Sequence, residues 1–136
     1  MRRGAAIFCL LVLSLAASAQ PSPPVKPPEL AVPSETLPPY EPQLLRLAEL
    51  MGALAYLRDL CGDSDADAYH DKMTSLLDAE ARSQARKDSL AGAYNRSFRD
   101  YEISYRACTP SAREIIDRFL SETARLTTDL ANRYGG

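Results

Sequence analysis

LAGAYNRSFRDYEISYRAC, residues 90–108, carries the longest apolar stripe in the sequence and ends in a cysteine. Within it, the stripe residues recur at steps of three and four, which places them along one side of an α-helix. The stripe consists of Leu90, Tyr94, Ser97, Phe98, Tyr101, Tyr105 and Cys108. Arginines and acidic residues fill most of the other side. The stretch therefore predicts an amphipathic helix whose aromatic side packs against neighbouring helices.

A second helical pattern covers residues 43–61, where leucines repeat along one stripe that Cys61 ends. Pro42 suits the first turn of this helix, because proline lacks the amide hydrogen that the first turn leaves unbonded. Gly62 suits the left-handed conformation that often follows a last turn. The sequence thus predicts a helix with defined ends immediately before an acidic turn.

The segment between these two patterns is harder to divide. An acidic turn offers Ser64 or Asp65 as the cap of a helix that begins near Tyr69. Over residues 81–89 the apolar residues are alanines alone. No glycine or proline interrupts the pattern there. Two helices and one long helix both fit, and we favour a continuous helix that bends near Arg82.

Thr109-Pro110 predicts a sharp helix start, with threonine as the cap and proline in the first turn. The helical pattern after it includes Leu120, Thr123, Leu126 and Thr127 on its stripe, continues to Tyr134 and ends at two glycines. No segment shows the alternation of a β-strand. The predicted fold is all-α, a small antiparallel bundle of three to four helices over residues 43–134.

The first 42 residues have a different composition from the helical part. Residues 1–19 have a basic start, an apolar run and a final Ala-Ser-Ala, which together predict a cleaved signal peptide. The run is shorter than the roughly 20 residues that cross a bilayer, so we expect no stable membrane span after cleavage. Residues 20–42 hold most of the ten prolines and predict a disordered, extended linker. The expected location is periplasmic or secreted.

Cleavage at this site leaves two of the three cysteines, Cys61 and Cys108, in an oxidising compartment. A disulfide between them closes a loop of about 47 residues, which removes on the order of 4 kcal/mol of unfolded-state freedom in the chain-entropy model. A redox role for two free thiols is the alternative, but it usually needs a close C-x-x-C pair. We therefore predict a structural disulfide that joins the ends of two core-facing helices.

Several short motifs occur in a fixed order along the helical part. They are M-x-x-L-L-x-A-E at residues 73–80, Y-N-x-S-F-x-x-Y at residues 94–101 and Y-x-x-C-T-P at residues 105–110. In this order, behind a signal peptide, they resemble an uncharacterised family of small exported alphaproteobacterial proteins with two well-separated cysteines. The resemblance covers residues 44–134. It implies export and a disulfide, and it brings no assigned activity.

Two sets of carboxylates deserve a chemical interpretation. Glu49 and Glu80 could meet across the bundle as a general acid and base, as in glycosidases that act on cell-wall material. Asp63, Asp65 and Asp67 reproduce the D-x-D-x-D opening of a calcium loop. That loop then requires glycine and a bidentate glutamate, and the sequence has alanine and threonine at those places. A carboxylate-rich helix start and ordinary surface ion pairs are the simpler interpretations.

The helix predicted for residues 90–108 also offers a possible interaction surface. Its residues are Tyr94, Arg96, Arg99, Tyr101, Tyr105 and Arg106. Arginine binds carboxylates and phosphates with a fork of donors, and tyrosine adds a flat ring with a polar end. The simpler alternative, which we favour, places the tyrosines in the core and pairs the arginines with Asp100, Glu102 and neighbouring helices.

The sequence contains no recognisable catalytic set, phosphate loop or metal motif, and a single histidine, so we expect no cofactor and no catalytic or metal residue. The eighteen acidic residues outnumber the basic ones, so we expect no nucleic-acid partner. The leading hypothesis is a non-catalytic periplasmic helical module that contacts an envelope protein or a cell-wall component. The alternatives are a carboxylate enzyme and a weak calcium-responsive module.

Overall fold

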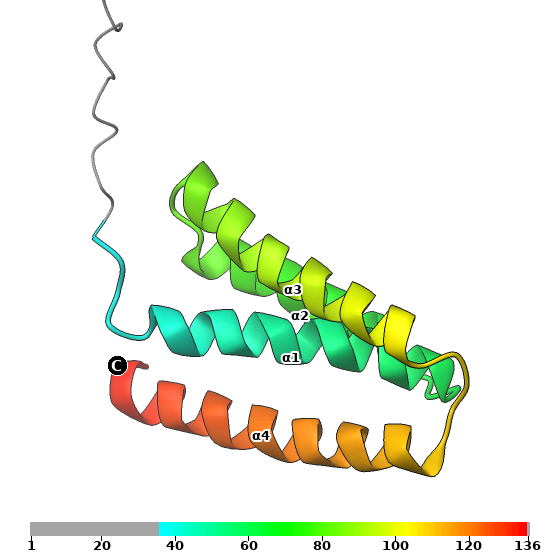
Figure 1. The fold of residues 1–136 in the computed structure, drawn as a ribbon. Coiled ribbons are helices and arrows are strands. Elements are labelled where there is room, and N and C mark those ends of the chain that lie inside the picture. Colours follow the sequence, from blue (N-terminus) through cyan, green and yellow to red (C-terminus); the bar gives the residue numbers. More distant parts are fainter. Residues whose placement is uncertain (1–35, 136) are drawn as a thin grey trace, which may run out of the picture. The chain divides into compact units, whose positions relative to one another are not determined.

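A computed structural model describes residues 36–135, and the statements about structure concern these residues. The predicted signal peptide and most of the predicted linker lie outside them. The described part contains four helices and no strand, so the all-α prediction is confirmed (Figure 1). The helices are α1 (Glu41–Leu60), α2 (Ala66–Glu80), α3 (Gln84–Ser104) and α4 (Pro110–Tyr134).

Helix α1 is the centre of the helical unit, with α2 and α3 on one side and α4 on the other (Figure 1). Its inward-facing residues are distributed round the whole helix rather than along one stripe. They are Glu41, Leu44, Leu47, Ala48, Leu50, Met51, Gly52, Ala53, Leu54, Ala55 and Leu57. A helix that is apolar on every side must be covered on every side. The core is therefore built on α1, and not on residues 90–108 as their long stripe indicated.

Helices α1 and α3 approach each other closely at Gly52. A Cβ atom at this position would lie 2.1 Å from the carbonyl oxygen of Tyr94 and 2.9 Å from its carbonyl carbon. Small buried residues surround this contact: Ala48 and Ala53 on α1, and Ala93 on α3. The absence of a side chain at Gly52 is thus what allows α3 to lie directly on α1.

The segment of residues 66–108 forms two helices, so the continuous helix that we favoured is wrong. Helix α2 ends at Glu80, and α3 begins after Ser83, whose hydroxyl accepts a hydrogen bond from the amide of Arg86 at 3.2 Å. Serine as a cap supplies the partner that the first turn of a helix lacks. A polar cap divides the two helices here without the glycine or proline that we took as necessary.

Arg86 joins three helix ends at the side of the bundle where α1 begins. Its guanidinium donates to the carboxylate of Glu41 at 2.6 and 2.8 Å, and both side chains are almost completely buried. It also donates to the main-chain carbonyl of Glu80 and lies 3.4 Å from the Glu80 carboxylate. The Glu41 hydrogen bonds raise the pKa of Arg86. One cation therefore holds together three helix ends: the start of α1, the end of α2 and the start of α3.

The opposite end is held by the predicted disulfide, which is confirmed. Cys61 and Cys108 are bonded with a Cα–Cα distance of 4.8 Å. Cys108, however, is exposed in the turn between α3 and α4, because α3 ends at Ser104. The bridge thus ties the end of α1 to this turn, rather than to the end of a second helix. Nearby, the hydroxyl of Tyr56 donates to the carbonyl oxygen of Tyr105 at 2.5 Å.

The local signals for helix ends were mostly correct. Thr109 caps α4 by accepting from the amide of Ala112 at 3.1 Å. Gly62 has the expected positive φ, 75°. Asp65 occupies the cap position of α2 but makes no capping hydrogen bond, since its carboxylate accepts from Arg58 Nε at 2.6 Å instead. Helix α1 begins at Glu41, two residues before its predicted start.

Replacing Gly52 by alanine should destabilise the protein by about 1–3 kcal/mol, because the new methyl group overlaps the backbone of α3. Urea unfolding followed by circular dichroism measures this loss. Gly92→Ala is the matched control, since its Cβ would meet only the flexible Arg96 side chain at 3.0 Å. The control should be neutral or more stable, as helical glycines generally cost up to about 1 kcal/mol. Equal effects of the two substitutions would contradict the close approach.

Replacing Arg86 by methionine should cost about 3–5 kcal/mol of unfolding free energy, because it leaves the Glu41 carboxylate buried without a cation. Adding Glu41→Leu should recover most of this loss, since two apolar side chains remove the uncompensated charge. The same unfolding assay tests both variants. Arg82→Met, at an exposed arginine nearby, is the control and should change little. A double variant as unstable as Arg86→Met would show that the ion pair is not the cause.

Candidate functional site

The three tyrosines of the predicted interaction surface pack against the core. Tyr94 is buried, and Tyr101 and Tyr105 are partly buried and lie against core residues. The Tyr101 ring meets Phe119 of α4 edge-on at 5.6 Å and stacks with Tyr105 at 6.1 Å. Burial raises the pKa of both Tyr94 and Tyr101. These rings serve mainly to hold the helices together.

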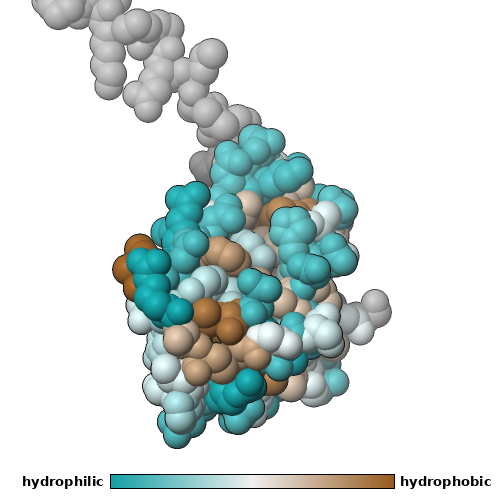
Figure 2. Space-filling model, turned by 90° about the vertical axis from the view of Figure 1, so that its right-hand side faces the viewer, coloured by the Kyte–Doolittle hydropathy of each residue, from teal (hydrophilic) through white to brown (hydrophobic). Residues whose placement is uncertain are grey.

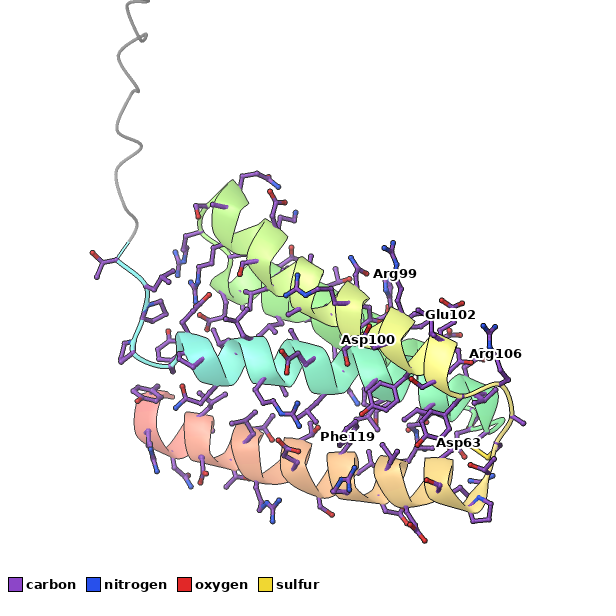
Figure 3. All side chains as sticks on the ribbon, viewed as in Figure 1. Asp63, Arg99, Asp100, Glu102, Arg106 and Phe119 are labelled. Atoms are coloured by element: carbon purple, nitrogen blue, oxygen red, sulfur yellow. A yellow bond between two sulfur atoms is a disulfide. The ribbon has the colours of Figure 1, made fainter. Side chains whose placement is uncertain are left out.

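The three arginines of that surface are exposed on α3 and in the turn after it. Figure 3 shows Arg99 and Arg106 pointing away from the bundle, with Glu102 between them. No ion pair of Arg96, Arg99 or Arg106 occurs within residues 36–135, so the expected pairing with Asp100 and Glu102 is not seen. Seen from the end that carries the disulfide, small apolar areas are interspersed with hydrophilic ones (Figure 2). An interaction role for these arginines stays a prediction.

Glu49 and Glu80 have separate partners in the structure. Glu49 accepts from Arg46 at 3.1 Å on the middle of α1, whereas Glu80 lies beside Arg86 and Tyr40. Arg86 also holds Glu41, which is eight residues before Glu49, or about 12 Å of helix rise. Each carboxylate therefore belongs to its own ion pair. The arrangement does not favour a shared catalytic site.

The acidic turn before α2 is engaged by arginines. Arg58 lies 2.6 Å from the carboxylate of Asp65 and 3.8 Å from that of Asp63, and Arg113 lies 4.0 Å from Asp63. Among the described residues, no three Asp, Glu, His or Cys side chains come together as a metal site. Asp63 and Asp65 thus hold the turn against α1 and α4.

Helix α4 leaves both of its flanks open. Its backbone lies close only to α1, so neither α2 nor α3 closes against it. Its buried residues, Ala112, Ile116 and Phe119, all lie in its first half. Beyond them, α4 is held by the ion pair of Glu122 with Arg46 of α1, by the partly buried Leu126 and Leu130, and by the contact between the Tyr134 and Tyr40 rings at 4.8 Å. A hollow consequently runs along each side of α4.

The hollow between α2 and α4 has a volume of about 550 Å³ and a mostly apolar lining, and we call it the α2–α4 groove. Helix α1 forms its floor. Its lining residues are Leu47, Met51, Tyr69, Lys72, Ser75, Leu76, Leu120, Thr123, Ala124 and Thr127. This volume falls within the roughly 300–1,000 Å³ of typical ligand sites, which are also mainly apolar. Sites of this kind commonly lie between the helices of a bundle.

Two polar groups line the α2–α4 groove, the hydroxyl of Thr123 and the ammonium of Lys72. The hydroxyl of Thr123 is buried and has no hydrogen-bond partner within residues 36–135. An unmade hydrogen bond of this kind costs about 1–3 kcal/mol. Lys72 is exposed, and its ammonium lies 4.5 Å from the centre of the Tyr69 ring, without an ion pair in the described chain. The groove thus combines an apolar floor, one cation and one unsatisfied hydroxyl.

The hollow on the other flank of α4 is smaller and highly charged. It measures about 280 Å³ and includes Arg46, Glu49, Arg96 and Asp100 in its lining. Asp100 of α3 and Phe119 of α4 lie on its two walls, as Figure 3 shows. Arg46 is engaged there in structural pairing, as it bonds Glu122 of α4 at 2.7 and 2.9 Å. At this hollow, α1 and α4 are joined mainly by the ion pair between Arg46 and Glu122.

The ion pair between Arg46 and Glu122 affects the protonation of both groups. The hydrogen bond from Arg46 holds the pKa of Glu122 below its usual range, and the same bond raises the pKa of Arg46. A carboxyl whose pKa is lower in the folded state stabilises that state above its unfolded pKa. The stabilisation is lost as the pH falls through the folded pKa.

The α2–α4 groove was not predicted from the sequence. Thr123 and Thr127 lie on the predicted stripe of the last helix. Periodicity shows which side of a helix is apolar, and not which part of that side a neighbouring helix covers. Lys72 gave no signal, because a lone exposed lysine looks like any surface residue.

Comparison with known proteins defines the family of the chain. A family model described as a protein of unknown function (DUF2385) matches residues 39–134 of the 136-residue chain. The chain belongs to this family. The matched range begins two residues before α1 and ends with α4, so the DUF2385 domain and the four-helix unit coincide. No curated protein and no solved structure matches the chain.

The family match confirms the resemblance only at the level of an uncharacterised domain. The alphaproteobacterial source and export stay predictions. Within residues 36–135, none of the helices combines the length and the apolar composition needed to cross a bilayer.

Replacing Glu122 by glutamine should flatten the loss of stability on acidification. In the unmodified protein, the lowered pKa of Glu122 makes stability fall below about pH 4.3, the usual value for an unfolded glutamate. The pair is partly exposed, so its contribution should not exceed about 1 kcal/mol. Urea unfolding between pH 3 and pH 6 measures it. Glu114→Gln, at an exposed position on α4, should leave the pH dependence unchanged, and a flattened profile in both variants would contradict the assignment.

Proposed function

We propose that this DUF2385 protein is a non-catalytic helical binding module of the cell envelope, and that the α2–α4 groove is its binding surface. The groove is the observation that carries the proposal. It is apolar, large enough for a ligand or for the side chains of a partner, and open because α4 packs on α1 alone. An uncovered apolar hollow of this kind marks an interaction site more often than it marks imperfect packing.

The distribution of charged groups supports a binding role over a catalytic one. Three arginines, Arg46, Arg58 and Arg86, each pair with a carboxylate from another helix or turn. These carboxylates therefore have a structural role. A catalytic pair of carboxylates would instead have to face one substrate hollow together. Glu49 and Glu80 line two separate hollows.

Two observations support a location in the envelope. The sequence of residues 1–19 has the pattern of a signal peptide. The disulfide between Cys61 and Cys108 is of a kind that persists in oxidising compartments and is rare in the cytosol. The proline-rich segment before α1 would then form the start of the processed chain. The partner would be an envelope protein or another envelope component.

Site-specific photo-crosslinking in a host that processes the leader tests the proposal. A photoreactive phenylalanine derivative is placed at Ser75, on the rim of the groove, or at Thr74, one residue away on the same helix and outside the groove. Both residues are exposed, so neither replacement disturbs the core. We expect adducts from position 75 and none from position 74, because only the first lies where a ligand binds.

The intact mass of the uncrosslinked protein from the same preparation tests the location. It should correspond to a chain that begins at Gln20 and is two hydrogens lighter than its reduced form. An unprocessed chain in which Cys61 and Cys108 are free thiols would overturn the envelope location. Equal labelling from positions 74 and 75, or none from either, would overturn the groove as the binding surface.

A further inference from the structure

We propose that the α2–α4 groove binds a fatty acid, that is, one acyl chain with an anionic carboxylate at its end. This inference rests on the proposed function and specifies the ligand of the same site. It follows from three properties of the groove: its shape, its volume and the sign of its charge.

The shape of the groove suits an extended chain. Its α4 wall extends from Leu120 to Thr127, and its α2 wall from Tyr69 to Leu76. Seven residues of helix rise correspond to about 10 Å, so both walls have the same length. Their apolar residues and the floor supplied by α1 line a path parallel to the helices. An acyl chain lying along this path removes its own surface and that of the groove from water.

The volume of the groove fits one chain. An atom the size of a water molecule occupies ~30 Å³ in a liquid, so 550 Å³ holds roughly 18 carbon-sized groups. An extended chain that fills the path of about 10 Å is shorter than this, so the groove takes a short acyl chain extended or a longer one bent. A phospholipid with two chains is more than twice as large and would leave most of one chain in water.

The charge of the groove selects an anionic end group. Lys72 is the charged residue in its lining, and no carboxylate lines it. The ammonium lies above the Tyr69 ring at the groove, so it is positioned beside the apolar path rather than far from it. The Thr123 hydroxyl is buried in the α4 wall, so Lys72 is the donor that an anionic end group can reach. Hydrogen bonds between a charged donor and a carboxylate are the stronger ones.

Displacement of cis-parinaric acid, a fluorescent fatty acid, from the mature full-length protein tests the inference. The competitors are dodecanoate, below its micelle-forming range, and 1-dodecanol, which has the same chain without the charge. Dodecanoate should bind about three- to tenfold more tightly than dodecanol, as expected for a partly exposed charged hydrogen bond. Lys72→Gln should abolish this preference and leave dodecanol binding unchanged. Lys87→Gln, at an exposed lysine on α3, should preserve the preference.

A second variant tests the site itself. Ala124→Phe places a ring in the groove from an exposed position on α4, so the fold should persist. It should weaken dodecanoate binding at least tenfold, whereas Ser121→Phe, outside the groove on the same helix, should not.

Three results would overturn the inference: no displacement at millimolar dodecanoate, equal binding by Ala124→Phe, or a carboxylate preference that survives Lys72→Gln. If crosslinks from position 75 then join a protein, the groove is a protein-binding surface and the proposed function stands without the fatty acid. Sedimentation velocity identifies the case in which that protein is a second copy. Failure of both the displacement and the crosslinking would remove the proposed function as well.

Discussion

The covering of α1 is the constraint on which the rest of this structure depends. Helix α1 has twenty residues and buried side chains on every side, with Arg46 and Glu49 partly exposed, so the other three helices are arranged about it. Gly52 sets how closely this can be done, because α3 occupies the space that a side chain there would need. Once α3 lies directly on α1, its aromatic residues fall at the edges of the contact. Tyr101 then reaches α4 through Phe119, and α4 completes the cover from the other side.

The two ends of the bundle are fastened by different means, and the difference explains why the middle is open. Arg86 joins α1, α2 and α3 but does not involve α4. The disulfide holds the turn before α4 at the other end. Between these points α4 is attached by its packing on α1 and by the ion pair of Arg46 with Glu122, both of which leave the side toward α2 free. The α2–α4 groove thus results from the positions of the disulfide and the two ion pairs, none of which joins α2 to α4.

Local features of the fold could be predicted from the sequence, and the relations between helices could not. Thr109, Gly62 and the two cysteines act through chemistry that is visible in a few adjacent residues, and these predictions were confirmed. The division at residues 81–83 was not predicted, because a serine cap can begin a new helix without the glycine or proline that usually marks a helix end in a sequence. The central place of α1 was not predicted, because apolar residues on several sides of a helix do not form a distinct stripe. Helix α3 is exposed to solvent on one side, so its apolar stripe is clear. Of the candidate site, Thr123 and Thr127 lay on a predicted stripe, but nothing local indicates which part of a stripe stays uncovered.

The two flanks of α4 differ in a way that bears on function. On the side toward α3, arginines and carboxylates neutralise one another around Arg46, and the hollow has little apolar surface to offer. On the side toward α2, the lining is apolar, Lys72 has no partner among the described residues and the Thr123 hydroxyl is unsatisfied. Closing that side with larger residues would have been a simple way to gain stability, since buried apolar area is the main source of it. This domain leaves that gain unused, while a disulfide and a buried ion pair hold its two ends, and this agrees with the groove's proposed role as a binding surface.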